Sequence, residues 1–393
     1  MNITEIRTFP VSYKLKEPFV IGNVVNEVLH YVITRIRSHE GIVGVSEAAP
    51  AWEVTGETQE SVRAAIALFC NRTLLGNSLI GRRAETLADV ERIFDEMLQP
   101  CEAPQLVWRN ATAKCAIECA LLDLVGKRRG VTVTELFGAE KRDAALTRVL
   151  GVSGVEETLA GARAAVDAGY TVVKLKVGVP GAGGLPGFER DIAVVNELGP
   201  ELKRRNITLV ADANQGYVDA ETAIAVLKKM RPFLTYMEQP VLADDKFGLK
   251  RVREATDVPV MADEAAHNLH DVQMLIELEA IDFLNIKLMK SSGIIGALRI
   301  ARECETHGVG YVLGSMIENT LGTAMNVTAY SVLGNAMSLA GLGPAAFEKR
   351  LGSGLTVEGN VLRLSDAPGF GIDITDEELA EFRTVPRDLT IRS

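Results

Sequence analysis

The sequence predicts an α/β protein in which a small α+β domain precedes a parallel (β/α) barrel. Three observations predict this fold. The chain has 393 residues, more than one ordinary domain needs. Its first part changes once from strand-like alternation to a helical period. The rest alternates short apolar strands with helices at a nearly constant spacing, which is typical of a barrel.

The first domain is expected to contain a few strands followed by helices. Three segments alternate apolar and polar residues and are predicted as strands: Asn2–Tyr13, Leu29–Ser38 and Val43–Ala48. From Thr58 the period becomes helical, and three helices are predicted: Ser61–Cys70, Ala84–Leu98 and Ala111–Gly130. We therefore assign residues 1–130 to an α+β domain, and we expect the tail, 355–393, to pack back onto it and complete it.

The second domain, assigned to residues 131–354, is indicated by the spacing of its strand ends. Apolar strands are predicted to end at Gly151, Lys176, Asp212, Glu238, Asp263 and Lys287. The steps from Asp212 to Glu238, Asp263 and Lys287 are 26, 25 and 24 residues. The step from Lys176 to Asp212 is 36 residues, because Pro180–Gly187 reads as an inserted loop. Two further steps reach Gly314 and Leu339–Gly341, which gives the eight strands of a barrel.

Composition excludes several classes of function. The net charge is −10, from 52 acidic and 42 basic residues, so we expect neither a nucleic-acid nor a membrane partner. The start has no signal-peptide pattern, and no apolar run approaches the roughly 18 residues that span a bilayer. The five cysteines are few and unpatterned, and Cys115 and Cys119 suit buried thiols better than a disulfide. These features predict a cytoplasmic protein.

Charged residues follow five consecutive predicted strands. They are Lys174 and Lys176 in VVKLKVG, Asp212 in LVADANQG, Glu238 in YMEQP, Asp263 in VMADEA and Lys287 in FLNIKLMK. The carboxyl ends of barrel strands meet on one face, so these side chains are expected together. Three carboxylates there would repel one another unless a cation held them, and an all-oxygen set favours Mg²⁺ over Ca²⁺ when water and substrate complete the shell. Lysines beside that ion are expected to have a pKa lowered toward neutrality.

Each of these residues also has an ordinary structural explanation. A single Asp or Glu after a strand commonly caps a helix, and a single Lys there is commonly a surface charge. Five matches in register on consecutive strands favour a functional site instead. The remaining alternative is a catalytically silent binding or structural protein that kept the fold.

At this point the motifs resemble a known family. KLKVG, DANQGY, MEQP, ADEA, NIKLMKSSGI and GSMIENTLGTA, with GIVGVSEAAPAWEVTGET and CAIECALLDLVGKRRG before them, are similar to the enolase superfamily, in its muconate lactonizing enzyme subgroup. The resemblance implies a modified TIM barrel, (β/α)7β, with an N-terminal α+β capping domain. It implies that Asp212, Glu238 and Asp263 bind Mg²⁺. Lys176 and Lys287 are implied as acid and base on opposite faces of the substrate, with Lys174 close to Lys176 and to the substrate carboxylate.

The same resemblance implies chemistry on a carbon next to a carboxylate. Mg²⁺ would stabilise the enolate formed when the α-proton leaves, and the two lysines would exchange protons with it. We expect a racemase or epimerase that acts on an N-acylated amino acid or a dipeptide-like carboxylate. Cycloisomerisation of the muconate type and syn-dehydration of the succinylbenzoate type use the same lysines and stay open. His267 and His270 follow Asp263 and are expected at the surface, not in catalysis.

Substrate contacts are expected from two loops of the capping domain, Pro18–Asn26 and Ala49–Gly56. Phe19, Ile21 and Trp52 are the candidates there, although Phe19 and Ile21 would equally suit packing between the domains. Asn214 and Glu318 are further candidates, and Glu318 could also support a lysine. The resemblance implies a homo-oligomer, a dimer or an octamer.

The eighth strand departs from the pattern of the dipeptide epimerases. Those enzymes carry Asp-x-Asp-Gly-Pro, which holds the substrate ammonium, whereas this chain has Ala340-Gly341-Leu342-Gly343-Pro344. A free α-ammonium would enter an apolar place without a partner. This predicts a substrate whose nitrogen is blocked or absent.

Overall fold

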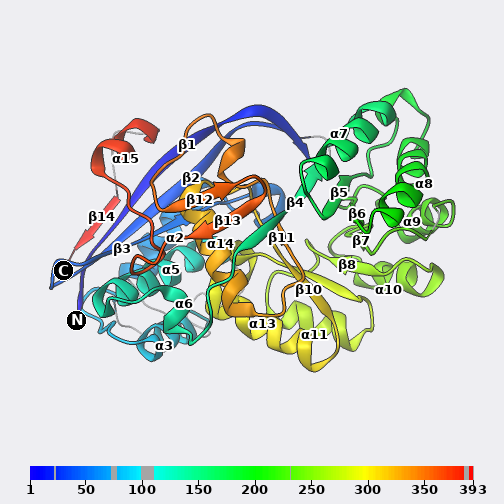
Figure 1. Cartoon of the computed structure of the whole chain (residues 1–393). Coiled ribbons are helices and arrows are strands. Elements are labelled where there is room, and N and C mark those ends of the chain that lie inside the picture. The colour runs from blue at the N-terminus through cyan, green and yellow to red at the C-terminus, as the bar shows by residue number, and fades with distance from the viewer. Residues whose placement is uncertain (22–23, 72–77, 99–109, 231, 385–388, 393) are drawn as a thin grey trace.

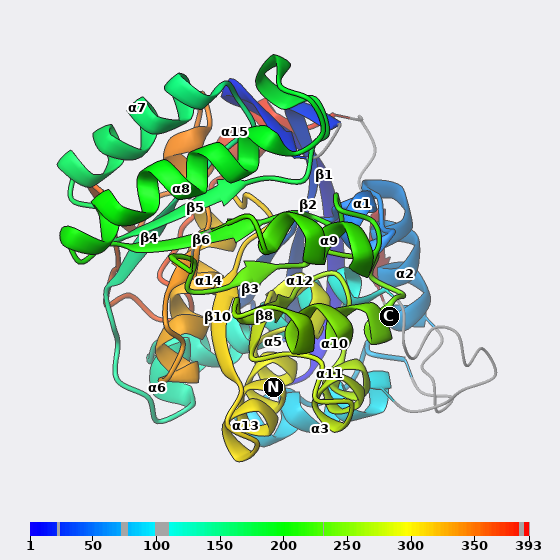
Figure 2. The same cartoon turned by 90° about the vertical axis from the view of Figure 1, so that its right-hand side faces the viewer.

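The computed structural model describes residues 1–21, 24–71, 78–98, 110–230, 232–384 and 389–392. The capping domain is built on an antiparallel sheet with the strand order β14-β1-β2-β3. Its strands are β1 (Ile3–Ile21), β2 (Val24–Ser38), β3 (Val43–Ala48) and β14 (Leu389–Arg392). In Figures 1 and 2 the far ends of β1 and β2 reach toward the barrel beside α7 (Val155–Asp167). One end of this sheet therefore lies close to the mouth of the barrel.

Helices α2 (Gln59–Asn71) and α5 (Ala111–Arg129) pack on the capping sheet. Helices α3 (Leu87–Leu98) and α6 (Val133–Leu136) pack on α5, and the short α1 (Trp52–Thr55) precedes α2. The long helix α5 packs against β2 and β3, with its residues from Thr112 to Gly126 buried. This close approach requires Gly44, since a Cβ there would lie 2.1 Å from the carbonyl oxygen of Ala120.

The second domain is a closed parallel barrel. Its eight described strands are β4 (Ala144–Leu150), β5 (Val172–Lys176), β6 (Thr208–Asp212), β7 (Met237–Glu238), β8 (Val260–Ala262), β9 (Phe283–Ile286), β10 (Gly310–Gly314) and β11 (Leu339–Ala340). Each pairs in parallel with the next, and β11 pairs with β4 to close the ring. The predicted strand ends at Gly151, Lys176, Asp212, Glu238, Asp263 and Lys287 agree with the observed ends to within one residue.

The crossover helices surround the barrel, as the green and yellow ribbons of Figure 2 show. After α7 they are α8 (Glu189–Arg204), α9 (Ala220–Leu227), α10 (Lys246–Ala255), α11 (Leu269–Glu277), α13 (Ile294–Thr306) and α14 (Thr320–Leu333). A four-residue helix, α12 (Leu288–Ser291), follows β9 directly. The expected insertion between β5 and α8 contains the 3₁₀ turn η1 (Ala182–Gly184), and a second turn, η2 (Pro344–Ala346), follows β11.

The tail after the barrel contacts both domains. The hairpin β12 (Leu355–Glu358) and β13 (Val361–Leu364) joins the barrel sheet through antiparallel pairing with β4. Helix α15 (Asp376–Phe382) packs near β1, and β14 pairs with β1. The tail thus completes the capping sheet through β14, while its hairpin extends the barrel sheet.

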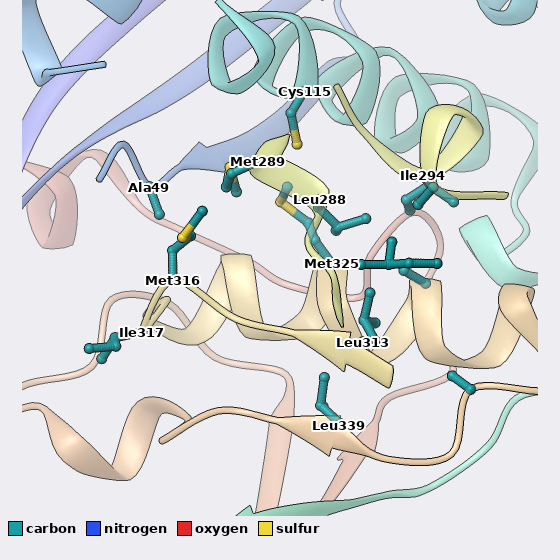
Figure 3. Packing of buried hydrophobic residues seen from close by; sticks show 14 of the residues in the cluster. Ala49, Cys115, Leu288, Met289, Ile294, Leu313, Met316, Ile317, Met325 and Leu339 are labelled. Atoms are coloured by element: carbon teal, nitrogen blue, oxygen red, sulfur yellow. The ribbon is translucent and has the colours of Figure 1, made fainter. Parts of the chain in front are cut away.

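The larger of two apolar clusters among the described residues runs from the capping domain into the barrel. Figure 3 shows Cys115 of α5 lying over Leu288 and Met289 of α12, with Leu313 and Leu339 of the barrel strands below. Cys70, Cys115, Cys119 and Cys304 are free buried thiols, and the sulfur atoms of Cys115 and Cys119 lie 3.9 Å apart. Cys101 falls outside the described residues. Across the described ranges, no helix combines the length and the hydropathy needed to cross a membrane.

Candidate active site

A cavity of about 630 Å³ lies at the mouth of the barrel, between the carboxyl ends of its strands and the capping domain. The barrel contributes four charged side chains to its wall, all from the strand ends, namely Lys174, Lys176, Asp212 and Lys287. The capping domain contributes Phe19, Tyr31 and the segments around α1 and the start of α2. The opposite part of the barrel rim is uncharged, with Ser315, Ala340, Gly341 and Leu342.

The lysines of β5 reach the first two carboxylates. Lys174 Nζ lies 2.8 Å from Asp212 Oδ2 and 2.8 Å from Glu238 Oε1. Lys176 Nζ lies 2.7 Å from Asp212 Oδ2 and donates to Asn214 Oδ1 at 2.6 Å. The strand alternates, so Lys174 and Lys176 point to the same side, into the barrel mouth.

The third carboxylate, Asp263, lies between two lysines that follow β9. Lys287 Nζ is 2.6 Å from Asp263 Oδ2, and Lys290 Nζ is 2.6 Å from Asp263 Oδ1. Asn285 connects the second and third carboxylates, because its side-chain nitrogen donates to Glu238 Oε1 at 2.8 Å. The backbone nitrogen of Asp263 donates to Gln239 Oε1 at 3.0 Å, which fixes the end of β8.

These ion pairs determine the ionisation of the site. Burial would raise the pKa of Asp212, but the nearby Lys174 and Lys176 hold it below the usual range. Burial would also raise the pKa of Asp263, but the charges of Lys287 and Lys290 hold it low. Burial together with the charges of neighbouring acids raises the pKa of Glu238 to about 7 and that of Glu264 to about 7.

The expected lowering of the lysine pKa values concerns lysines beside a bound cation and stays a prediction, whereas in this arrangement of direct ion pairs the pKa of two of the lysines is raised. Burial by itself would lower the pKa of Lys174, but the charges of Asp212 and Glu238 outweigh burial and raise it. For Lys287 burial would again lower the pKa, but the charge of Asp263 outweighs burial and raises it. The reason is that the ammonium groups pair directly with the carboxylates.

The carboxylates fit a divalent metal by their chemistry. As the described side chains stand, no three His, Cys, Asp or Glu residues are close enough together to hold a metal. However, Asp212 and Glu238 already share one cation, the Lys174 ammonium. Oε2 of Glu264 is buried and accepts no hydrogen bond from the described part of the chain. An all-oxygen carboxylate set with an unused buried oxygen beside it suits Mg²⁺.

The polar residues of the site that were not among the sequence candidates include Asn285, Glu264 and Lys290, all buried, and Glu53 of α1 on the cavity wall. The Glu264 carboxylate accepts a hydrogen bond from the Asn214 side-chain nitrogen at 2.9 Å. Glu264 stands next to Asp263 in ADEA, and Asn285 stands two residues before Lys287. Their closeness to predicted site residues was the only signal available.

The predicted substrate contacts fall into three groups. Phe19, Trp52 and Asn214 line the cavity, and the Trp52 side chain is exposed. Glu318 does not line it: the carboxylate is buried and accepts from the backbone nitrogen of Met316 at 2.9 Å. Ile21 ends β1, and its side chain falls outside the described residues.

His267 is not the surface residue that the sequence suggested. Its ring is mostly buried, and Nε2 lies 2.6 Å from the carbonyl oxygen of Val54 in α1. The contact joins the loop after β8 to the capping helix that carries Trp52. The sequence could not indicate it, because the two residues are far apart along the chain.

Comparison with known proteins identifies the class. The family model of the mandelate racemase / muconate lactonizing enzyme N-terminal domain matches residues 3–138. The enolase C-terminal domain-like model matches residues 157–379. The chain therefore belongs to the enolase superfamily, in its muconate lactonizing enzyme-like subgroup.

Named relatives narrow the class to racemases and epimerases, which are isomerases. N-succinyl-L-Arg/Lys racemase of Bacillus cereus is 29% identical over 391 residues, covering 99% of this chain and 100% of that protein. Its crystal structure superimposes with a TM-score of 0.87 over 100% of both chains. L-Ala-D/L-Glu epimerase of Bacillus subtilis is 31% identical, covering 95% of this chain and 97% of the relative. A dipeptide epimerase of Cytophaga hutchinsonii, solved with Mg and D-Ala-L-Val, is 26% identical with a TM-score of 0.84 over 100% of both chains.

Proposed function

We propose that this protein is a Mg²⁺-dependent racemase or epimerase that moves the proton next to a carboxylate, on an N-acylated amino acid or a dipeptide-like acid. One observation carries the proposal. Lys176 and Lys287 end β5 and follow β9, which are four places apart in the closed ring of eight described strands. The two lysines therefore approach the cavity from opposite sides of the barrel, as proton transfer between two faces of one carbon requires.

The chain's own groups can carry out this exchange. Mg²⁺ bound by Asp212, Glu238 and Asp263 would stabilise the negative charge that the substrate carboxylate gains as the proton leaves. One lysine, as the neutral amine, accepts the α-proton when the C–H bond breaks. The other lysine, as the ammonium, donates a proton to the opposite face of the same carbon. Lys174, which lines the cavity and is buried, supplies a fixed positive charge for the carboxylate.

The uncharged rim supports a substrate without a free α-ammonium. Ala340, Gly341 and Leu342 line the cavity where dipeptide epimerases are expected to hold that ammonium with acids. An unpaired ammonium in this apolar place would lose its hydration without gaining a partner. An acylated nitrogen, which carries no charge, avoids this cost.

The capping side of the cavity favours a positively charged substrate side chain. Glu53 of α1 lines the cavity, is partly buried and forms no ion pair with another residue that the structure describes. The barrel end of the cavity wall carries three lysines and one carboxylate, Asp212, so its charge is opposite to that of Glu53 at the capping end. A substrate with a carboxylate at one end and a cation at the other, such as an N-acylated arginine or lysine, matches this polarity.

The test is proton exchange in D₂O with Mg²⁺, followed by mass spectrometry and chiral separation. The panel contains N-succinyl and N-acetyl amino acids, dipeptides, muconates and succinylbenzoate precursors. The proposal predicts a mass increase of one unit without other change in the N-acyl compounds, which a Lys176→Ala variant loses for one enantiomer. A product of altered constitution from a muconate or a succinylbenzoate precursor would replace the proposal with a cycloisomerase or a dehydratase.

A further inference from the structure

Lys290 is a buried lysine beside the site that lies outside the cavity wall. Its side chain, in the short helix α12, is 1% exposed. The ammonium contacts three oxygen atoms: Asp263 Oδ1 at 2.6 Å, the carbonyl of Asp263 at 2.5 Å and the carbonyl of Asn285 at 3.0 Å. A lysine ammonium has three N–H donors, so every donor has a partner.

Lys287 holds the other oxygen of the same carboxylate. Its Nζ lies 2.6 Å from Asp263 Oδ2, and unlike Lys290 it lines the cavity. Asp263 is therefore held by one lysine from the cavity side and by another from the protein interior. Only the cavity-side lysine can approach a substrate.

The two pairings have different consequences for the reaction. Oδ2 must become available if Asp263 is to bind a metal, and Lys287 must leave Asp263 before it can exchange a proton with substrate. If Lys287 left and no second lysine were present, the buried Asp263 carboxylate would have no ammonium partner, which is costly. Lys290 is the partner that stays, because its donors are used and no solvent reaches it.

Lys290 also links two strand ends. Its contacts with the carbonyls of Asp263 and Asn285 join the residue after β8 to the third residue of β9. The Asn285 side chain in turn donates to Glu238 Oε1. Displacement of Lys290 would therefore move two of the three carboxylates relative to each other.

We propose that Lys290 is a positioning residue: it fixes Oδ1 of Asp263 from the interior, keeps Oδ2 turned toward the cavity and allows Lys287 to leave. The part that concerns Lys287 rests on the proposed function. The part that concerns Asp263 does not, since it follows from the contacts of the metal-site carboxylate alone.

The first experiment measures Mg²⁺ binding to the metal-free full-length protein by titration calorimetry, with no substrate. Lys290→Met is expected to weaken Mg²⁺ binding about tenfold or more, because Asp263 then turns wholly toward Lys287. Lys114→Met is the matched control, since Lys114 is also 1% exposed but lies on α5 of the capping domain. Unchanged or tighter binding in Lys290→Met would show that Lys290 acts only as an opposing charge, and would overturn the proposal.

A second variant guards against simple misfolding. Lys290→Gln keeps hydrogen-bond donors without the charge, and it is expected to bind Mg²⁺ more tightly than Lys290→Met does. If neither variant folds, Lys287→Met tests the same arrangement from the cavity side: it frees Oδ2 of Asp263 while Lys290 keeps Oδ1, so Mg²⁺ affinity is expected to rise, and a fall would contradict the proposal. Equal affinities of folded Lys290→Gln and Lys290→Met would contradict orientation by hydrogen bonds.

The second experiment follows α-proton exchange of each enantiomer in D₂O at saturating Mg²⁺. The enantiomer that loses exchange in Lys287→Ala identifies the face served by Lys287. In Lys290→Met, exchange on that face is expected to slow about tenfold relative to the face served by Lys176. An equal loss on both faces would indicate a merely structural role, whereas no exchange in the wild type would refute the proposed function and leave the Mg²⁺ result standing.

Discussion

Glu47, at the boundary between the two domains, is an acid whose environment disfavours its charge. It is fully buried in β3, where Oε1 accepts from the backbone nitrogen of Asn319 at 2.8 Å and Oε2 accepts from the Tyr13 hydroxyl at 3.2 Å. Burial, and to a smaller extent the charge of Glu318, raises the pKa of Glu47 to about 8 despite these hydrogen bonds. Between pH 4.5 and about 8, Glu47 therefore keeps its proton in the folded protein and releases it in the unfolded chain.

This pKa makes the stability depend on pH. Glu47 has a higher pKa in the folded state than the ordinary value of 4.5, so its contribution is complete below pH 4.5 and is lost as the pH rises toward about 8. Glu47→Gln is expected to flatten the fall in the free energy of unfolding between pH 5 and 8. Urea unfolding at several pH values measures how the free energy of unfolding changes with pH. An equal fall in the variant and the wild type would contradict the raised pKa of Glu47.

Glu53 gives a second prediction at the scale of one residue. Glu53→Gln is expected to reduce kcat/KM for N-succinyl-arginine about fivefold, on the order of 1 kcal/mol for a partly exposed ion pair. Activity toward N-succinyl-citrulline, which has nearly the same shape without the charge, should stay within about twofold. Glu60→Gln is the matched control, because Glu60 also lines the cavity but is exposed and accepts from Thr58 Oγ1. Equal losses for both substrates would argue against a role in charge recognition.

At the scale of elements, helix α5 connects the two domains through buried acids. Glu118 accepts from the backbone nitrogens of Ile294 at 3.2 Å and Ile295 at 2.8 Å, which begin the barrel helix α13. Asp123 accepts from Val45 and Phe370, each at 2.8 Å, and so ties β3 and the tail to the same helix. A carboxylate at the start of a helix satisfies donors that have no partner within that helix.

Removal of the Glu118 carboxylate should loosen this connection. Glu118→Ala leaves two buried N–H groups without acceptors, and we expect the free energy of unfolding to fall by about 2 kcal/mol or more. Glu118→Gln keeps one acceptor and should lose less. Chemical denaturation followed by circular dichroism measures both variants, and a stability equal to that of the wild type in Glu118→Ala would refute the capping role.

The element scale also shows what the sequence could and could not predict. Five consecutive strand ends in the barrel were predictable because the apolar run stops at a charged residue, as Asp212 and Glu238 illustrate. The first two strands are longer than expected, since β1 continues through Lys14 and Lys16 to Ile21. The alternation of apolar and charged residues continues through Leu15 and Lys16 but stops at Glu17-Pro18, so the last part of the strand was not marked by the sequence. It is held by pairing with β2, as in Phe19 opposite Asn26, which is a contact between segments.

The candidate site was predictable where its charged residues stand at strand ends, but not where a contact joins segments that are distant along the chain. Lys176, Asp212 and Lys287 were found from their positions at strand ends. Lys290 could not be found in this way, because its role depends on where its side chain turns after β9. His267 likewise contacts Val54 across the domain boundary, which no local pattern records.

At the scale of the whole molecule, the candidate active site lies where the two domains meet. The barrel supplies the lysines and Asp212 of the cavity wall, and the capping domain supplies α1 and residues near the ends of β1 and β2. The expected homo-oligomer stays a prediction. Val218, Leu242 and Phe247 are exposed apolar residues on the loops and helix that follow β6 and β7. Light scattering coupled to gel filtration checks the prediction of a dimer or octamer, and a monomer at all concentrations would contradict it.

The central claim, proton transfer between two lysines on opposite sides of the barrel, is tested most directly by exchange of separate enantiomers in D₂O. Lys176→Ala and Lys287→Ala are each incubated with Mg²⁺ and one enantiomer of the active N-acyl amino acid. The prediction is that both variants lose racemisation, while each still exchanges the α-proton of one enantiomer, and the two variants retain opposite enantiomers. Retention of racemisation in either variant, or exchange of the same enantiomer by both, would contradict the claim.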